Sequence, residues 1–349
     1  MNKDDLKIAI IGAGPAGGIL GTYLSQTNPD IIIVDVWKKH LNAIKNNGLE
    51  IVGKADLNGK FKANNLLTNS KELKELKPNI VFIAVKTTFL QIVLNELKDI
   101  LQPDTYVISY QNGIGTEQDI AKVFGTKNTL RVVINYAGNV KSPGKINMTF
   151  FNPPNYIGVM NSEGEETAKL IAKVMTDSGL PTEFNPEIQV KVWQKAILNS
   201  TLSGICAITQ MTMQEAMSFQ ETYHIVSNVL KESIFVANAN NIEVPEEFHE
   251  KGLMYLKKGG HHKPSMLIDI ENHRQTEVQY LNNKIVEYAR KKDIKIPFNE
   301  ALSSFISGLD FINKNIRNYV KIKVEELDFK EECVFCSYVK DCIDTFSFC

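Results

Sequence analysis

A glycine-rich hexapeptide near the N-terminus is the first feature that could carry chemistry. Gly12-Ala13-Gly14-Pro15-Ala16-Gly17 follows an apolar, strand-like run and opens a segment of helical periodicity that extends to about Ser25. Glycines at these spacings allow a tight turn, bring backbone N–H groups close to a pyrophosphate and let the helix pack closely on the strand. The positive end of the helix dipole then faces the phosphates. A glycine-rich turn without a ligand is the alternative, but the strand before the motif and the helix after it favour a dinucleotide site.

Asp35 indicates which dinucleotide such a site would prefer. It ends the next strand-like run, 18 residues after Gly17. A carboxylate at this position accepts hydrogen bonds from the ribose hydroxyls and repels a 2′-phosphate, so Asp35 favours NAD(H) over NADP(H). Asp35 could also cap the helix that follows Val36, and Lys38 and Lys39 could neutralise a phosphate. Both cofactors therefore stay open, with NAD(H) preferred.

Three polar side chains lie on one stripe of an otherwise apolar helix, which is predicted from Glu187 to Thr209. Lys195, Asn199 and Ser203 stand at i, i+4 and i+8 of this segment, and a helix that is apolar all round is buried. A buried lysine without a partner has a lowered pKa, which is how catalytic lysines arise. The alternative is a lysine at the flank of the helix whose ammonium group reaches solvent. Periodicity does not decide between the two.

A second helix, predicted from Ser265 to about Arg290, repeats this pattern. Arg274 falls near the centre of its inward face and Glu277 on the flank of that face. The two could form a structural ion pair or take part in catalysis. Ser265 would cap the helix, and its hydroxyl with the free N–H groups would suit a carboxylate. Two other acids are predicted to point outward, Asp269 and Glu287.

The elements that must position these residues alternate between strands and helices in the first half of the chain. The strand-like runs are short, rich in β-branched residues and nearly continuous in apolar character, which is typical of parallel strands buried on both faces. We therefore expect an α/β fold with right-handed βαβ units and a Rossmann-type, doubly wound parallel sheet. A small hairpin around residues 56–59 is expected to interrupt it. The predicted strands of the main sheet are Leu6–Ile11, Ile31–Val34, Ile80–Val85, Tyr106–Tyr110 and Leu130–Ile134.

The alternation ends at Asn185-Pro186, and nearly everything after this point has helical periodicity. We place a domain boundary there. Residues 1–184 would form the dinucleotide-binding domain, residues 185–325 an all-α helical bundle for substrate binding and dimerisation, and residues 326–349 a cysteine-rich tail. The stretch Ala196–Gln214 has no charged residue, but its many hydroxyl and amide groups suit burial in protein and not in lipid. We expect this helix to pack across a homodimer interface, and we expect no membrane span.

Length and charge narrow the class of protein further. The chain has 349 residues, 39 Lys+Arg against 40 Asp+Glu, and 43% hydrophobic residues. These values suit one large or two ordinary globular domains. A formal net charge of −1 supplies no field that would attract nucleic acid, and the N-terminus runs into a strand and not into a signal peptide. We expect a cytoplasmic protein without nucleic-acid or membrane partners.

Cysteine is concentrated near the C-terminus. An odd total of five cysteines without a secretion signal favours reduced thiols. Four thiolates in the tail could bind Zn²⁺ or an iron–sulfur cluster. Their spacing matches no familiar ligand set, however, and the interleaved aromatic residues favour an apolar extension that packs on the bundle or on another subunit. We therefore predict no metal site. Cys206 stands alone, and the tail holds Cys333, Cys336, Cys342 and Cys349.

These features together resemble the ketopantoate reductase (2-dehydropantoate 2-reductase) family over about residues 6–302. Each matching fragment is short, but their order and spacing are specific, notably the 12 residues from Ser265 to Glu277. The fragments are Gly12–Gly17, Val85-Lys86-Thr87, Gln111-Asn112-Gly113-Ile114-Gly115, Trp193-Gln194-Lys195 with Asn199, Ser265-Met266-Leu267 with Asp269, and Thr276-Glu277.

The resemblance implies catalytic roles for two residues. Lys195 would be the general acid that protonates the ketone oxygen as hydride arrives from the nicotinamide. Glu277 would bind the substrate hydroxyl and hold Lys195 in position. An ammonium group near a developing alkoxide stabilises the negative charge that the reduction creates.

The resemblance also implies five ligand contacts. Asn199 and Ser265 would bind the substrate, Ser265 at its carboxylate end. Asn112 would touch both the nicotinamide ribose and the substrate, and Lys86 would line the cofactor side of the cleft. Ser203 would line the substrate pocket where the family commonly has an asparagine. The shorter side chain adds room and removes an amide donor, which weakens the case for ketopantoate itself.

We therefore expect an NAD(P)H-dependent reductase that converts a small 2-keto acid to the 2-hydroxy acid, with ketopantoate to pantoate, a step of pantothenate biosynthesis, as the first candidate. One alternative is an enzyme of the same architecture that acts on another 2-oxo acid or an imine. A dinucleotide sensor without catalysis is another. The joint presence of Lys195, Asn199 and Glu277 disfavours the sensor, which need not keep proton-transfer groups.

Overall fold

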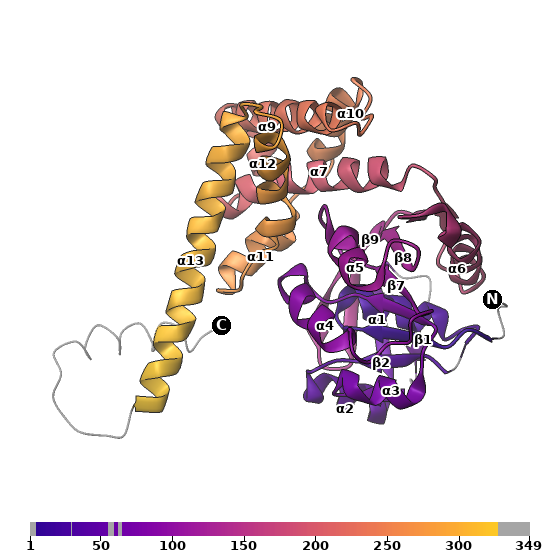
Figure 1. Cartoon of the computed structure of the whole chain (residues 1–349). Coiled ribbons are helices and arrows are strands. Elements are labelled where there is room, and N and C mark those ends of the chain that lie inside the picture. Colours follow the sequence, from indigo (N-terminus) through magenta and orange to yellow (C-terminus); the bar gives the residue numbers. More distant parts are fainter. Residues whose placement is uncertain (1–4, 29, 55–58, 62–64, 327–349) are drawn as a thin grey trace.

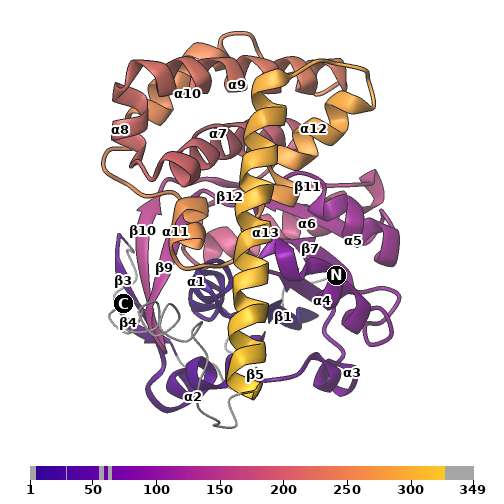
Figure 2. The ribbon, with the colours of Figure 1, turned by 90° about the vertical axis from the view of Figure 1, so that its left-hand side faces the viewer.

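The computed structural model describes residues 5–28, 30–54, 59–61 and 65–326. The chain forms a half built around a sheet and a half built from helices, and the long last helix extends past the others (Figure 1). In a perpendicular view, this helix runs most of the height of the molecule (Figure 2). The four cysteines of the predicted tail lie outside the described residues, so the prediction for the tail stays untested. Cys206 is a buried free cysteine.

An eight-stranded sheet confirms the predicted doubly wound architecture. The strand order is β12-β11-β8-β7-β6-β1-β2-β5, and all neighbours are parallel except β8 and β11. Each of the five predicted runs overlaps one of these strands, with ends that differ by at most two residues. The strands are β1 (Ile8–Ile11), β2 (Ile32–Val34), β5 (Asn65–Leu67), β6 (Ile80–Ile83), β7 (Tyr106–Ser109), β8 (Thr129–Val133), β11 (Asn155–Val159) and β12 (Thr182–Phe184).

Helices cover both faces of this sheet, which explains why its strands are apolar on both sides. In β1, Ile8 and Ile10 belong to the apolar core on one face, and Ala9 and Ile11 to the core on the other. The first core includes side chains of α1 (Pro15–Leu24), α2 (Lys38–Asn47) and α6 (Glu165–Asp177). The second includes α3 (Leu73–Leu76), α4 (Leu90–Leu97) and α5 (Thr116–Phe124). Short 3₁₀ turns are η2 (Ser70–Glu72), η3 (Thr87–Phe89), η4 (Ser162–Gly164) and η5 (Val278–Tyr280).

The predicted hairpin exists, but it belongs to a second sheet that the sequence did not indicate. β3 (Leu49–Gly53) and β4 (Gly59–Phe61) are antiparallel, and β3 also pairs in parallel with β10 (Lys145–Phe151), which pairs with β9 (Tyr136–Ser142). This sheet packs against α1 so closely that a Cβ on Gly18 would lie 2.4 Å from Ile146 Cδ1. The second sheet thus supports the helix that follows the glycine motif.

The second half is helical, as predicted. It starts at α7 (Ile188–Thr209), which three residues separate from β12, and its helices share one apolar core. Most of Ala196–Gln214 is buried by helices of the same chain, so its lack of charge needs no partner subunit. None of the helices in the described part of the chain is long and apolar enough to cross a bilayer. The remaining helices are α8 (Met213–Ser218), α9 (Gln220–Ala239), α10 (Phe248–Lys257), α11 (Ser265–Glu271), α12 (Asn282–Arg290) and α13 (Pro297–Glu326).

The predicted continuous helix from Ser265 to Arg290 is wrong. It is broken into α11, an irregular segment with η5, and α12. His273 adopts a left-handed backbone with φ of 49°, which ends a right-handed helix. The backbone N–H and the hydroxyl of Thr276 both donate to the Asp310 carboxylate on α13, each at 2.9 Å. A contact from a distant helix therefore stabilises the break.

Candidate active site

A cleft of about 1870 Å³ is lined by residues of both halves. It lies beyond the carboxyl ends of β1, β6, β7 and β8, and the strand order reverses between β1 and β6, where doubly wound sheets bind their ligands. Its volume exceeds the roughly 300–1,000 Å³ of a typical small-molecule pocket, so a dinucleotide and a small acid fit together. The predicted site residues that line it are Gly12, Gly14, Pro15, Ala16, Asp35, Lys86, Asn112, Lys195, Asn199, Ser203, Ser265 and Glu277.

The glycine loop is shaped for close approach of a phosphate. A Cβ on Gly17 would lie 2.0 Å from the carbonyl oxygen of Gly12, and Gly12 itself has φ of +105°. Gly14, in contrast, has no atom within 4 Å of where a Cβ would be. Two glycines are therefore needed for packing, and the third leaves the backbone at the start of α1 open to the cleft. This cradle fits a pyrophosphate.

Asp35 makes two backbone contacts that connect it to the glycine loop. Its Oδ2 accepts from the N–H of Ala13 at 2.6 Å, and its Oδ1 accepts from the N–H of Trp37 at 2.8 Å. Asp35 does not cap α2, because Trp37 occupies the N-cap position and no side chain caps this helix. The carboxylate lies in the wall of the cleft instead. Both oxygens keep lone pairs for further donors, so the carboxylate fits the ribose of a dinucleotide.

His40 is a residue of this region that sequence reasoning missed. It is 1% exposed, and its Nδ1 accepts from the N–H of Gly144 at 3.0 Å, so Nε2 carries the proton and donates to the carbonyl of Ala13 at 3.1 Å. Burial lowers the pKa of His40. The neutral imidazole therefore connects the glycine loop to the turn between β9 and β10. A single histidine in an amphipathic helix offered no signal for this role.

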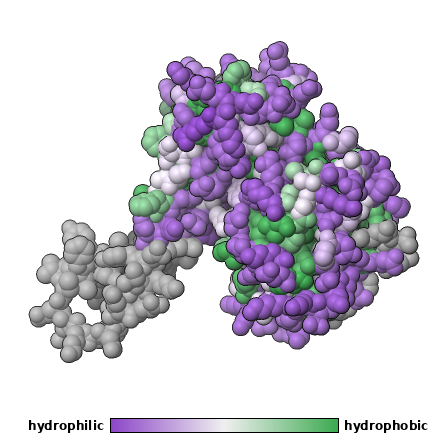
Figure 3. Space-filling model, viewed as in Figure 1, coloured by the Kyte–Doolittle hydropathy of each residue, from purple (hydrophilic) through white to green (hydrophobic). Residues whose placement is uncertain are grey.

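Apolar side chains form one wall of the cleft beside α4. Phe89 and Ile92 are 54% and 56% exposed and line the cleft, and Figure 3 shows apolar side chains gathered on the sheet half in this region. Exposed apolar side chains in a cleft are typical of a ligand site. This wall suits the flat face of a base.

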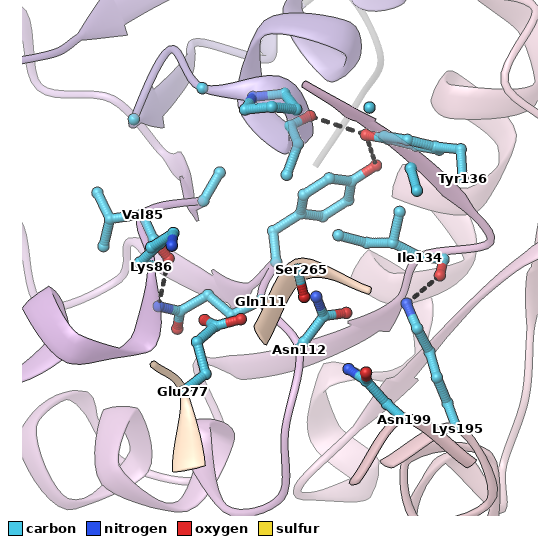
Figure 4. Close-up of a pocket in the computed structure, with 18 of the residues that line it drawn as sticks. Val85, Lys86, Gln111, Asn112, Ile134, Tyr136, Lys195, Asn199, Ser265 and Glu277 are labelled. Atoms are coloured by element: carbon cyan, nitrogen blue, oxygen red, sulfur yellow. Dashed lines mark hydrogen bonds between the residues drawn. The ribbon is translucent and has the colours of Figure 1, made fainter. Parts of the chain in front are cut away.

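Lys195 enters the cleft from α7 and is partly buried. Its Nζ donates to the carbonyl oxygen of Ile134, which follows β8 (Figure 4). Burial lowers the pKa of Lys195 to about 7, the charge of Arg131 lowers it too, and Glu277 opposes the shift. Of the two interpretations that periodicity left open, the structure matches the desolvated lysine. Its ammonium group can release a proton near neutral pH.

Glu277 does not hold Lys195 as the family resemblance implied. Its Oε1 accepts from the backbone N–H and from the hydroxyl of Thr87, each at 3.0 Å. Thr87 follows β6, so the contact joins the end of a strand in the sheet half to the segment before η5. Lys195 is held by Ile134, and Glu277 by Thr87.

Three predictions about residues in and after α11 are wrong. Asp269 is 3% exposed and does not point outward, because it pairs with Lys86 at 2.5 Å and with Arg274 at 3.0 Å. Arg274 therefore forms no ion pair with Glu277. Ser265 does not cap α11, since Pro264 occupies the N-cap position. The break in the predicted helix accounts for the first two errors, because it turns residues 269–277 relative to the helical pattern.

The polar residues predicted to bind substrate come from different elements. Asn112 lies in the loop after β7, Asn199 and Ser203 on α7, and Ser265 at the start of α11. The hydroxyl of Ser203 donates to Oδ1 of Asn199 at 2.8 Å. The amide N–H₂ of Asn199 is the group left to donate into the cleft.

The fold and the site together define a class of protein, a dinucleotide-binding oxidoreductase with a helical second half. The family model described as "Ketopantoate reductase PanE/ApbA" matches residues 8–162, and its C-terminal counterpart matches residues 187–310. The chain belongs to the ketopantoate reductase family. It is accordingly an NAD(P)-dependent oxidoreductase that acts on a CH–OH group.

Curated relatives match this chain over most of its length. The 2-dehydropantoate 2-reductase of Pyrococcus abyssi is 31% identical over 303 residues, which cover 87% of this chain and 97% of the relative. The enzyme of the same name from Streptococcus pyogenes is 26% identical over 307 residues, 87% of this chain and 98% of the relative.

Solved structures have the same fold. A PanE/ApbA family ketopantoate reductase from Ralstonia eutropha superposes with a TM-score of 0.79 at 21% identity, covering 88% of this chain and 100% of that chain. D-mandelate dehydrogenase in a ternary structure with NADH and anilino(oxo)acetate gives 0.77 at 25% identity, with coverage of 88% and 100%. A nicotinamide dinucleotide is the cofactor of this architecture.

Proposed function

We propose that this protein reduces a small 2-keto acid to the 2-hydroxy acid and uses NADH in preference to NADPH. Ketopantoate is the first candidate substrate. The observation that carries the proposal is the position of Lys195, whose Nζ donates to the carbonyl of Ile134 at the carboxyl end of the sheet, in the same cleft as the glycine loop. Burial lowers its pKa to about 7. Curated relatives named 2-dehydropantoate 2-reductase support the choice of substrate.

Lys195 is the general acid in this proposal. A bound nicotinamide would supply the hydride. Lys195 donates a proton from Nζ to the ketone oxygen as the carbonyl carbon accepts the hydride, so the oxygen stays on that carbon as the hydroxyl of the 2-hydroxy acid. The ammonium group stabilises the negative charge that develops on this oxygen. The carbonyl of Ile134 fixes Nζ in the cleft beforehand. A group with a pKa near the working pH is well suited to proton transfer.

The remaining polar groups bind and orient the substrate. Glu277 uses Oε1 for its two bonds from Thr87, so Oε2 is the atom we assign to the substrate hydroxyl. The amides of Asn112 and Asn199 contact the substrate from the two sides of the cleft, and the hydroxyl of Ser265 binds its carboxylate. Lys86 borders the cofactor.

The preference for NADH rests on Asp35. A 2′-phosphate would meet this carboxylate directly and be repelled. The neighbouring D-mandelate dehydrogenase structure contains NADH.

That neighbour also favours a second candidate function, the reduction of another 2-oxo acid. Ser203 supports it from within this chain, because its bond to Asn199 occupies one of the two lone pairs of the amide oxygen and leaves only the other for a hydroxyl of ketopantoate.

A panel of 2-keto acids tests the proposal. Ketopantoate, phenylglyoxylate, 2-oxo-3-methylbutanoate and pyruvate are offered with NADH or NADPH, and cofactor oxidation is followed by absorbance. Turnover of at least one acid, faster with NADH, is expected. Failure to turn over any of them, or a clear preference for NADPH, would contradict it.

The role of Lys195 is tested by K195A, with the exposed lysine on α9 changed in a matched control, K231A. Loss of the general acid should lower kcat by about 10²- to 10⁴-fold, and the control should be unchanged. Activity of K195A within about tenfold of wild type would exclude proton donation by this residue.

The predicted homodimer stays a prediction, which sedimentation velocity would test.

A further inference from the structure

We propose that Arg131, together with its ion-pair partner Glu117, is a positioning residue for the reaction. It fixes the loop that carries Asn112 and places a positive charge near Lys195. The inference rests on the proposed function. Arg131 lies in the middle of β8, whose apolar run Leu130–Ile134 it interrupts. It is 2% exposed and Glu117 is fully buried. A buried ion pair contributes little net stability compared with apolar side chains of similar size, so the fold alone does not explain it.

The guanidinium group holds three parts of the chain together. Its Nη1 donates to the hydroxyls of Ser109 and Thr116, each at 2.5 Å, and its Nη2 donates to the carbonyl of Gly113 at 2.9 Å. Ser109 ends β7 and Thr116 begins α5. The loop that carries Asn112 runs between them. A planar fork of donors fixes the geometry of all three acceptors at once, which a lysine cannot do.

The far side of the same loop contacts the segment after Glu277. The N–H of Ile114 donates to the carbonyl of Tyr280 at 2.7 Å. A Cβ on Gly113, which has φ of +91°, would lie 2.6 Å from that carbonyl oxygen. The loop is thus confined between Arg131 and η5. Displacement of the guanidinium would move Asn112 and disturb the segment of Glu277 in the same step.

The charge of Arg131 also acts on the groups around it. It lowers the pKa of Lys195, while Glu277 raises it. Burial lowers the pKa of Arg131, and the charges of Glu117 and Glu277 oppose this shift. The charged groups that act on Lys195 are therefore Arg131 from β8 and Glu277 from the segment before η5. Arg131 therefore has two effects, the positioning of the loop that carries Asn112 and the electrostatic effect on Lys195, and different variants can remove them.

Two variants separate these effects. R131K keeps the charge but loses the fork, so kcat/KM should fall by about 10- to 100-fold, as for a small misplacement of a binding group, with the pH dependence unchanged. The double variant R131Q/E117Q removes both charges without leaving one unpaired, so it should move the titration of Lys195 to higher pH as well. A matched control removes an exposed ion pair between α12 and α13, R290Q/E300Q, and should change neither quantity.

The titration of Lys195 is followed without turnover, by the pH dependence of its modification with a small amine-reactive reagent and peptide mass spectrometry. If wild type reduces no 2-keto acid, the proposed function fails, and this readout still tests Arg131. T116V and S109A, which keep the buried charges, replace any variant that does not fold, and each should lower kcat/KM several-fold. Two results together would overturn the proposal and show that Arg131 has only a structural role. The folded variants would keep the wild-type kcat/KM, and the double variant would leave the pH of the Lys195 titration unchanged.

Discussion

Raising the pH above neutrality should switch off the proposed reduction at a pH where an ordinary lysine is still charged. Lys195 must be protonated to act as a general acid. Its pKa is lowered from 10.5 to about 7 by burial and by the charge of Arg131. A lysine with a lowered pKa is protonated below that value and loses its proton as the pH rises through it. Activity is therefore present at acidic and neutral pH and is lost on the alkaline side.

The size of the effect follows from this pKa. With a value of about 7, Lys195 is about 90% protonated at about pH 6 and about 3% protonated at about pH 8.5, so kcat/KM should fall roughly 30-fold. An unperturbed lysine would lose only about 1% of its protons over this range. The two cases are easily distinguished.

The assay measures initial rates of NADH oxidation at low substrate concentration, since kcat/KM reports the free enzyme. K195R provides the test of assignment, because arginine stays charged throughout this range and its residual activity should show no alkaline loss. K231R is the matched control and should keep the wild-type profile. A wild-type profile that is flat to about pH 9, or an alkaline loss that persists in K195R, would refute the reasoning.

Three further changes have definite expected outcomes. D35A should lower kcat/KM with NADH by about tenfold and raise it with NADPH, and an unchanged cofactor ratio would exclude Asp35 from ribose recognition. G17A places a Cβ 2.0 Å from a carbonyl oxygen of the same loop and should lower the free energy of unfolding in urea by more than about 2 kcal/mol. G14A, the matched control with open space, should keep its stability and bind NADH more weakly in fluorescence titration. T87V removes one of the two bonds to Glu277 and should lower kcat/KM about three- to tenfold; no change would show that the backbone N–H suffices.

Much of the sheet half could be predicted because its strands carry their own signal. Apolar runs such as Ile80–Ile83 are buried along their whole length, so their composition alone indicates a strand. The second sheet could not be predicted in this way. In β9 only Tyr136 is buried and the residues after it alternate between partial and full exposure, so the strand is defined by its pairing with β10. β10 also pairs with β3, which lies far away in the sequence.

The residues that line the cleft could also be predicted, but their partners could not. Lys195, Asn199 and Ser203 follow from helical spacing alone. The bond from Lys195 to Ile134 and the bonds from Thr87 to Glu277 join elements that no local pattern relates. The burial of Asp269 depends on a break in the helix that a distant side chain on α13 stabilises, and periodicity within residues 265–290 contains no sign of it.

Lys86 and Thr87, in the segment that follows β6, form contacts that indicate when the active site is completed during folding. Lys86 contacts Asp269, 183 residues later, and Thr87 contacts Glu277, 190 residues later. Contacts between such distant parts of a chain form only after the loop between them has closed, which makes them late events in folding. A ribosome that has released only the sheet half has produced a chain that already contains the glycine loop and Asp35. That nascent chain does not yet contain Lys195 or Glu277. The residues predicted to recognise the cofactor are therefore synthesised well before the proposed general acid.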